Sequence, residues 1–221
     1  MIVAAKCAPE ERILVEVARA GLAAVELYLN QRWLQAAEEI VKTCQAIDLR
    51  YALHAPTDCH LPGPVAALAK ALRCKVVVFH DIYWLDEWRE IAEAFAGSGA
   101  LPCVENIGSL HEPMRVMRRF GFGRCLDFEH FQMQVNGVFA SEFGPFLREA
   151  SHVHLTGYVA GGELWHTHIH RSPEHCTSLL NMLRDSGYSG LVVSEASTPY
   201  QTLADFKGLK SFFDAWAAEQ A

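Results

Sequence analysis

The sequence has no C-x-x-C pair, although it contains seven cysteines, at positions 7, 44, 59, 74, 103, 125 and 176. A disulfide framework or a cysteine-based zinc knuckle needs an even or closely spaced set, so we expect reduced thiols. No apolar run approaches the roughly 18 residues of a membrane span, and the first residues lack a basic region followed by a long apolar stretch. We therefore expect a cytoplasmic protein without a membrane segment.

The sequence also has fewer cationic than anionic residues. Lysine and arginine together number 19 against 26 aspartate and glutamate residues, which gives a net charge of -7. Non-specific affinity for nucleic acid comes mainly from cationic groups that neutralise phosphates, so this balance argues against a nucleic-acid partner. Bound divalent cations would make a local site more positive than the bulk charge suggests. A small-molecule substrate, including an anionic one, is therefore compatible with the composition, whereas the oligomeric state is not predicted.

The chain alternates strand-like and helix-like patterns. With 221 residues and 51% apolar content it can form one sizeable core, and we expect one domain over residues 1–221. The strand-like runs are Ile2–Ala5, Ala23–Leu27, Tyr51–His54, Val76–His80, Leu101–Asn106, Arg124–Asp127, His152–Leu155 and Leu191–Glu195. Eight such β-α units predict an α/β fold, a single (β/α)8 barrel. An open doubly wound sheet would normally have a glycine-rich turn after its first strand, and Lys6–Pro9 offers none.

Metal-capable side chains stand at the ends of six of these runs. They are His54, His80, Glu105, Asp127, His154 and Glu195. In a barrel the C-terminal ends of the strands meet at one rim, so we expect these residues to converge. The last four supply three carboxylates and one imidazole, a set that suits zinc, manganese, magnesium or cobalt. One such carboxylate alone would as readily cap a helix, but their joint occurrence at successive strand ends favours a metal site.

Further histidines widen this candidate site. His130 follows Asp127 by three residues, and His166 and His168 lie in the irregular stretch Thr156–Arg171. Catalytic zinc takes about three protein ligands plus water, so nine candidate ligands indicate more than one ion. Because the quartet alone could hold a single ion, we expect one to three divalent ions per chain, with zinc favoured.

Three residues have other expected roles. His152 alternates with His154 along one strand and should share its inward face, where it would orient a ligand instead of being one. Arg171 follows the histidine-rich stretch, and its planar guanidinium suits a substrate phosphate or carboxylate. We expect Arg171, together with His130, to bind substrate.

Taken together, the sequence resembles the xylose-isomerase-like TIM barrels, which include sugar isomerases and epimerases and the endonuclease IV group (AP endonuclease family 2). The match runs nearly end to end. The segments that carry it are Gly21–Leu27, Val104–Asn106, Cys125–His130, His154–Leu155, and Gly187–Gly190 leading to Val193–Glu195.

The resemblance implies roles for the candidate ligands. The strand-end quartet of Glu105, Asp127, His154 and Glu195 is similar to the single-metal site of the epimerases, where the two glutamates act as acid and base on opposite sides of the substrate carbon. The histidines resemble the trinuclear zinc site of endonuclease IV instead. That likeness implies one ion on His54, His80 and Glu105, a second on the quartet, and a third on His130, His166 and His168. The family pattern has aspartate where this chain has His166, which predicts weaker binding, replacement or absence of the third ion.

These observations lead to one principal expectation and one alternative. We first expect a two- or three-metal hydrolase of a small phosphoester or similar substrate, because His54 and His80 exceed what one ion requires. The alternative is a sugar or sugar-phosphate isomerase or epimerase that uses one metal and the pair Glu105 and Glu195 to move a proton through an enediolate. An AP-site endonuclease is disfavoured because no basic, aromatic-rich insertion is present. A non-catalytic binding protein leaves the many ligands at one rim unexplained.

Overall fold

The computed structural model describes residues 1–108, 112–130, 140–158 and 166–219. Eight parallel strands form a closed barrel in which each strand pairs with its neighbours in the sequence and β8 pairs with β1. The strands are β1 (Ile2–Cys7), β2 (Ala24–Tyr28), β3 (Arg50–His54), β4 (Val76–His80), β5 (Leu101–Glu105), β6 (Gly123–Asp127), β7 (Ala150–Leu155) and β8 (Leu191–Ser194). The predicted (β/α)8 barrel is confirmed, and seven of the eight predicted strands end within one residue of the observed position.

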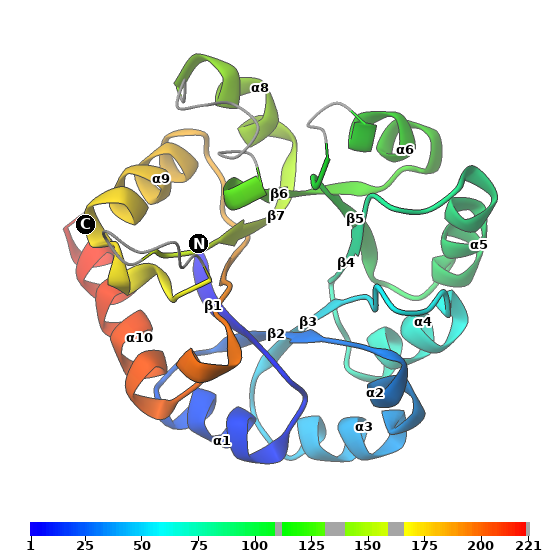
Figure 1. Cartoon of the computed structure of the whole chain (residues 1–221), viewed down its shortest axis with the longest axis horizontal. Helices are drawn as coiled ribbons and strands as arrows, with labels where there is room; N and C mark the ends of the chain where they lie inside the picture. The colour runs from blue at the N-terminus through cyan, green and yellow to red at the C-terminus, as the bar shows by residue number, and fades with distance from the viewer. Residues whose placement is uncertain (109–111, 131–139, 159–165, 220–221) are drawn as a thin grey trace.

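Helices surround the barrel as an outer ring (Figure 1). They are α1 (Glu11–Arg19), α2 (Gln31–Gln35), α3 (Ala37–Gln45), α4 (Pro62–Ala71), α5 (Leu85–Phe95), α6 (Glu112–Phe120), α8 (Ala140–Glu149), α9 (Pro173–Asp185) and α10 (Leu203–Ala218), with 3-10 turns η1 (Ile169–Arg171) and η2 (Thr198–Tyr200). A glycine follows the end of α9: Gly187 has φ +80°, a conformation that favours glycine after a helix. Within the described ranges, none of these helices has the length and apolar character needed to cross a membrane.

The main apolar core lies between the strands and the helices. Side chains alternate along each strand, so one set packs outward on the helices and the other faces the barrel interior. The inward set forms two small apolar clusters of its own, one around Ala4, Ala24 and Val193 and the other around Val78, Cys103 and Cys125. Polar inward-facing side chains lie above these clusters, at the C-terminal ends of the strands. The apolar clusters therefore support the candidate site from below.

The outward core can be tested at Leu126, which is fully buried on β6. Leu126→Ala removes buried methyl groups and leaves a cavity, so the free energy of unfolding should fall by about 2–5 kcal/mol. Urea denaturation followed by circular dichroism measures this change. As a matched control, Leu61→Ala at a 38% exposed position should change stability by less than about 1 kcal/mol. Equal effects of the two substitutions would contradict the assigned packing.

Candidate metal centre

The strand ends bring the predicted quartet together. Glu105 is the last residue of β5, Asp127 is the last of β6, His154 lies on β7, and Glu195 follows β8. All four are buried, and each offers one ligand atom within 4.8 Å of the others. The Nδ1 atom of His154 lies 3.1 Å from Glu105 Oε1, 2.8 Å from Glu195 Oε1 and 3.8 Å from Asp127 Oδ2.

These separations of 2.8, 3.1 and 3.8 Å are close to those around a shared cation. Metal–ligand bonds of about 2.0–2.2 Å imply ligand–ligand distances of about 3.0–3.5 Å around a tetrahedral or octahedral ion. Three carboxylate oxygens and one imidazole nitrogen form a donor set that takes magnesium, manganese, cobalt or zinc. The quartet is therefore a candidate site for one divalent ion by both geometry and chemistry.

The charges of the quartet also favour a bound divalent cation. Burial, together with the negative charges of Glu105 and Glu195, raises the pKa of Asp127 well above its usual value. Burial also raises the pKa of Glu195, but the charges of Lys6 and His154 outweigh it and lower the pKa below the ordinary range. Three buried carboxylates whose oxygens lie within 4.8 Å of one another repel, and a divalent cation among them would remove that repulsion.

Lys6 is a member of the site that sequence reasoning missed. Its ammonium group contacts Glu195 Oε1 and lies 3.8 Å from Glu26 Oε1. The first strand was predicted to end at Ala5, which left Lys6 in the following loop, whereas β1 continues to Cys7. In the observed register Lys6 pairs with Glu26 and Ala4 pairs with Ala24. The alternation of Ala4 and Lys6 on one strand face was the available signal.

Glu26 was also missed, and it lies beneath the quartet. This fully buried carboxylate on β2 accepts a hydrogen bond of 2.7 Å from His152 Nε2, and its Oε1 lies 3.1 Å from His154 Nε2. Glu26 thereby fixes the ring of His154 and leaves Nδ1 for the quartet, the arrangement that metal-binding histidines commonly show. His152 reaches His154 through Glu26, in agreement with its expected orienting role.

Replacing Glu26 should therefore weaken metal binding without removing a ligand. Glu26→Gln keeps the size of the side chain but loses the charge that supports the imidazole of His154. We expect affinity for Mn²⁺ or Zn²⁺ to fall about 10–100-fold, measured by competition with a chromogenic chelator. Glu174→Gln, at an exposed position of α9, is the matched control and should leave affinity unchanged. An unchanged affinity in Glu26→Gln would show that Glu26 has only a packing role.

His54 and His80 form a second group around Glu105. The Nε2 atoms of His54 and His80 lie 3.0 and 3.3 Å from Glu105 Oε2, the oxygen that does not face His154. Their rings meet edge to face with centroids 4.7 Å apart. Burial and the neighbouring His54 lower the pKa of His80 to about 4, so its ring is neutral at pH 7. Glu105 therefore stands between two groups of potential ligands, as a bridging carboxylate would.

The structure does not bring together the three histidines expected to hold a third ion. The ring of His130 contacts the carbonyl of Asn106, and the buried ring of His168 contacts Ser194 Oγ, each at 3.0 Å. His166 is 46% exposed, with Nδ1 3.4 Å from Glu129 Oε2. Across the described ranges, no group of potential ligands contains these histidines. The third ion is thus a prediction that the geometry does not support.

Arg171 already has a partner inside the protein. Its Nη2 and Nε donate to Asp205 Oδ1 at 2.6 and 3.2 Å, and its guanidinium lies 4.9 Å from the centre of the Tyr200 ring. This pair joins η1 to α10. The expected contacts of Arg171 and His130 with a substrate remain predictions.

A cavity of about 190 Å³ adjoins the quartet at the rim. Its walls include Lys6, Glu195, Tyr28, His166, Ser197, Thr198 and Gln201. Gln201 is buried, and its Nε2 donates to the carbonyl of Ala196, whereas its Oε1 has no partner in the described part of the chain. Hydroxyl and amide groups thus border the cavity next to one member of the quartet.

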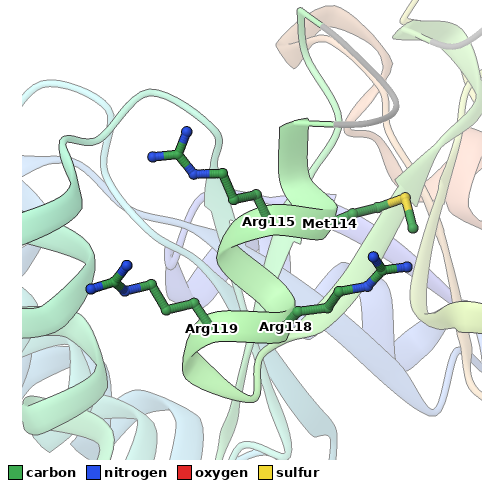
Figure 2. A pocket seen from close by; sticks show the side chains of 4 residues that line it. All are labelled: Met114, Arg115, Arg118 and Arg119. Atoms are coloured by element: carbon green, nitrogen blue, oxygen red, sulfur yellow. The ribbon is translucent and has the colours of Figure 1, made fainter.

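A larger surface hollow of about 700 Å³ lies elsewhere, on α6 (Figure 2). It is lined by Met114, Arg115, Arg118 and Arg119. The side chain of Arg118 extends to the opposite side of the helix from those of Arg115 and Arg119. The three guanidinium groups therefore do not converge on a common ligand, and the hollow lacks members of the quartet.

Solved structures match the chain over nearly its whole length, although no protein-family model and no curated protein sequence matches it. A D-tagatose 3-epimerase-like protein superposes with a TM-score of 0.69 at 15% identity, over 100% of both chains. D-allulose 3-epimerase from Methylomonas sp. gives 0.70 at 14% identity, over 98% of both chains. A xylose isomerase domain protein from Planctomyces limnophilus gives 0.65 at 11% identity, over 98% of this chain and 94% of that one. The (β/α)8-barrel fold is confirmed.

Proposed function

We propose that this protein is an isomerase or epimerase that uses one divalent metal ion and acts on a small sugar or sugar phosphate. The observation that carries the proposal is that Glu105 and Glu195 both contact one His154 nitrogen, at 3.1 and 2.8 Å. They come from β5 and β8, which stand three places apart around the barrel. The two carboxylates can therefore approach one substrate carbon from different directions.

This proposal reverses the order expected from the sequence, which placed hydrolysis first. The solved structures of similar fold include 3-epimerases, one of them in complex with D-allulose, and their likeness supports the alternative. The hydrolase expectation depended on counting histidines, and the three assigned to a third ion do not form a group in the described ranges. The quartet alone supplies what proton transfer requires.

Each residue has a distinct part in the proposed reaction. A divalent ion on the quartet would polarise the carbonyl and hydroxyl oxygens of the substrate. Glu195, held ionised by Lys6, would take a proton from the carbon beside the carbonyl, and Glu105, after taking a proton from water, would return one on the other side. Lys6 keeps Glu195 Oε1 in place, which leaves Oε2, 3.9 Å from His166, for the substrate.

The rim cavity supports a substrate rich in hydroxyl groups. The unpartnered Oε1 of Gln201 would accept a hydrogen bond from a sugar hydroxyl, and a buried acceptor left without a donor is costly. Ser197, Thr198 and Tyr28 add further hydroxyl groups to the same walls. We propose that this cavity binds the sugar chain beyond the reacting carbon.

The principal test is solvent exchange during turnover. Metal-loaded protein is incubated in D2O with D-tagatose, D-allulose, L-ribulose and ribulose 5-phosphate, and the products are followed by proton NMR. We expect at least one sugar to give an epimer or isomer that carries solvent deuterium at the carbon beside the carbonyl. Protein stripped with chelator serves as the control and should give neither.

Hydrolysis remains a second candidate because His54, His80 and Glu105 form a group that could hold another ion. A two-metal hydrolase needs that ion to activate water, whereas the proposed isomerase does not. His54→Ala should therefore abolish hydrolysis but leave proton transfer largely intact. Cleavage of 4-nitrophenyl phosphate, with no deuterium in any of the four sugars, would reject the isomerase proposal in favour of the hydrolase.

A further inference from the structure

A second cavity lies at the opposite end of the barrel from the quartet. It has a volume of about 610 Å³, within the range of about 300–1,000 Å³ typical of small-molecule sites. It is bordered by the first residues of four strands, Ile2, Arg50, Val76 and Leu191, and by Ser151, the second residue of β7. Active sites of such barrels lie at the C-terminal rim, so this cavity is separate from the proposed chemistry.

Three cationic side chains surround this cavity. Arg50, Arg73 and Lys75 all contribute to its lining. Within the described ranges, none of the three takes part in an ion pair, and the lining includes no aspartate or glutamate. The local charge is therefore strongly positive on a chain whose net charge is -7, which favours an anionic occupant.

The backbone at Arg73 adds to this argument. Arg73 follows α4 and has φ +56°, in the left-handed region where glycine is favoured and a side chain is strained. The chain nevertheless has arginine at this helix end. A guanidinium group beside the cavity is therefore present at a conformational cost, which a role in binding would explain.

The interior wall of the cavity supplies a polar contact of a different kind. His152 lines the cavity and is fully buried. Its Nε2 donates to Glu26, and its Nδ1 has no hydrogen-bond partner among the described residues. With the ring proton on Nε2, Nδ1 is an acceptor, so it calls for an O–H or N–H group on the occupant. Apolar side chains such as Leu49, Leu72 and Tyr51 cover much of the remaining wall.

We propose that this cavity is a second binding site, for a small organic phosphate or carboxylate that has an apolar body and a hydroxyl group. The anionic group would pair with Arg50, Arg73 and Lys75, and the hydroxyl would donate to His152 Nδ1. Because His152 is joined through Glu26 to His154, the site lies two hydrogen bonds from the metal quartet.

The probe for this site is 4-hydroxyphenyl phosphate, which combines a phosphate, an aromatic ring and a hydroxyl group. Calorimetric titration should show saturable binding with one site per chain. Arg73→Gly should weaken binding more than about tenfold, through loss of a charge-assisted contact, while the protein keeps or gains thermal stability. Arg50→Gln combined with Lys75→Gln should abolish binding, and Lys42→Gln, which removes an exposed cation outside the cavity, should not alter it.

Nitrogen-15 NMR of the histidine side chains locates the probe. On saturation the Nδ1 resonance of His152 should move upfield, as expected when a ring nitrogen accepts a hydrogen bond, and amides of residues 189–191 should shift. Glu195→Gln should leave the affinity unchanged, because the quartet lies at the other end of the barrel. The proposal is overturned if no saturable binding occurs, if Arg73→Gly and Lys42→Gln bind alike, or if the shifts fall at the quartet instead.

Discussion

Glu195→Gln is expected to lower kcat for epimerisation or isomerisation by about 10²–10⁴-fold at saturating metal concentration. Glutamine preserves the size of the side chain but has neither the negative charge that Lys6 and His154 contact nor an oxygen that takes a proton. The loss should appear mainly in kcat, since the cavity walls that bind the sugar stay in place. Steady-state kinetics with the sugar that shows turnover measures it.

The direction of proton transfer makes this prediction sharper. In a two-base mechanism each carboxylate removes the proton from one of the two epimers. Glu195→Gln should therefore retain slow solvent exchange with one epimer and lose it with the other, and Glu105→Gln should show the opposite preference. If both variants lose exchange equally with both epimers, the two glutamates act only as metal ligands. Glu174→Gln, on the surface of α9, should keep the full rate.

The fold and the quartet could be predicted from the sequence for one physical reason. Parallel strands in a barrel end at a common rim, so a polar residue at a strand end has a defined position whatever its distance along the chain. Glu105 and Asp127 follow apolar runs whose ends are plain in the sequence. Closure of the barrel is sufficient to place their side chains beside His154.

Residues inside the strands were harder to predict. Glu26 and Lys6 lie within β2 and β1, where alternation shows which residues share a face of the strand but not which of the two faces is inward. An error of two residues at the end of β1 was enough to place Lys6 in a loop. Their importance follows from contacts between strands, Lys6 with Glu195 and Glu26 with His154, which depend on register and not on any local motif.

The placement of the histidines after the strands was harder to predict for a related reason. Their positions depend on loops, whose paths the strand pattern does not determine. His168 turns inward to Ser194 and stacks on His170, whereas His130 packs on the backbone of Asn106. A histidine near a strand end in sequence is therefore weaker evidence for a ligand than one that forms part of the strand, such as His54 or His154.

Removal of the metal should abolish turnover and lower thermal stability together. An ion that binds only the folded state at about 100 times its Kd adds about 2.7 kcal/mol, a rise in Tm of roughly 5–11 °C for a chain of this size. Dialysis against a chelator, followed by calorimetry and metal analysis, measures both effects. About one ion per chain would agree with the quartet alone, and two would mean that the group of His54, His80 and Glu105 is filled as well.

Asp127→Asn tests whether Asp127 is a metal ligand or a residue that only stabilises the fold. Asparagine can still accept the hydrogen bond that the His130 backbone N–H donates to Oδ1, but it lacks the charged Oδ2 that faces His154. Without metal this variant should melt at a higher temperature than the unmodified protein, because it removes one of three repelling buried carboxylates. Addition of metal should raise the melting temperature of this variant only a little, because one of the four ligands is weakened. The order of melting temperatures thus reverses when metal is added, whereas Asp48→Asn, at an exposed position, should follow the unmodified protein in both states. If Asp127→Asn lowers Tm equally with and without the ion, Asp127 is a structural residue and the quartet is not the metal site.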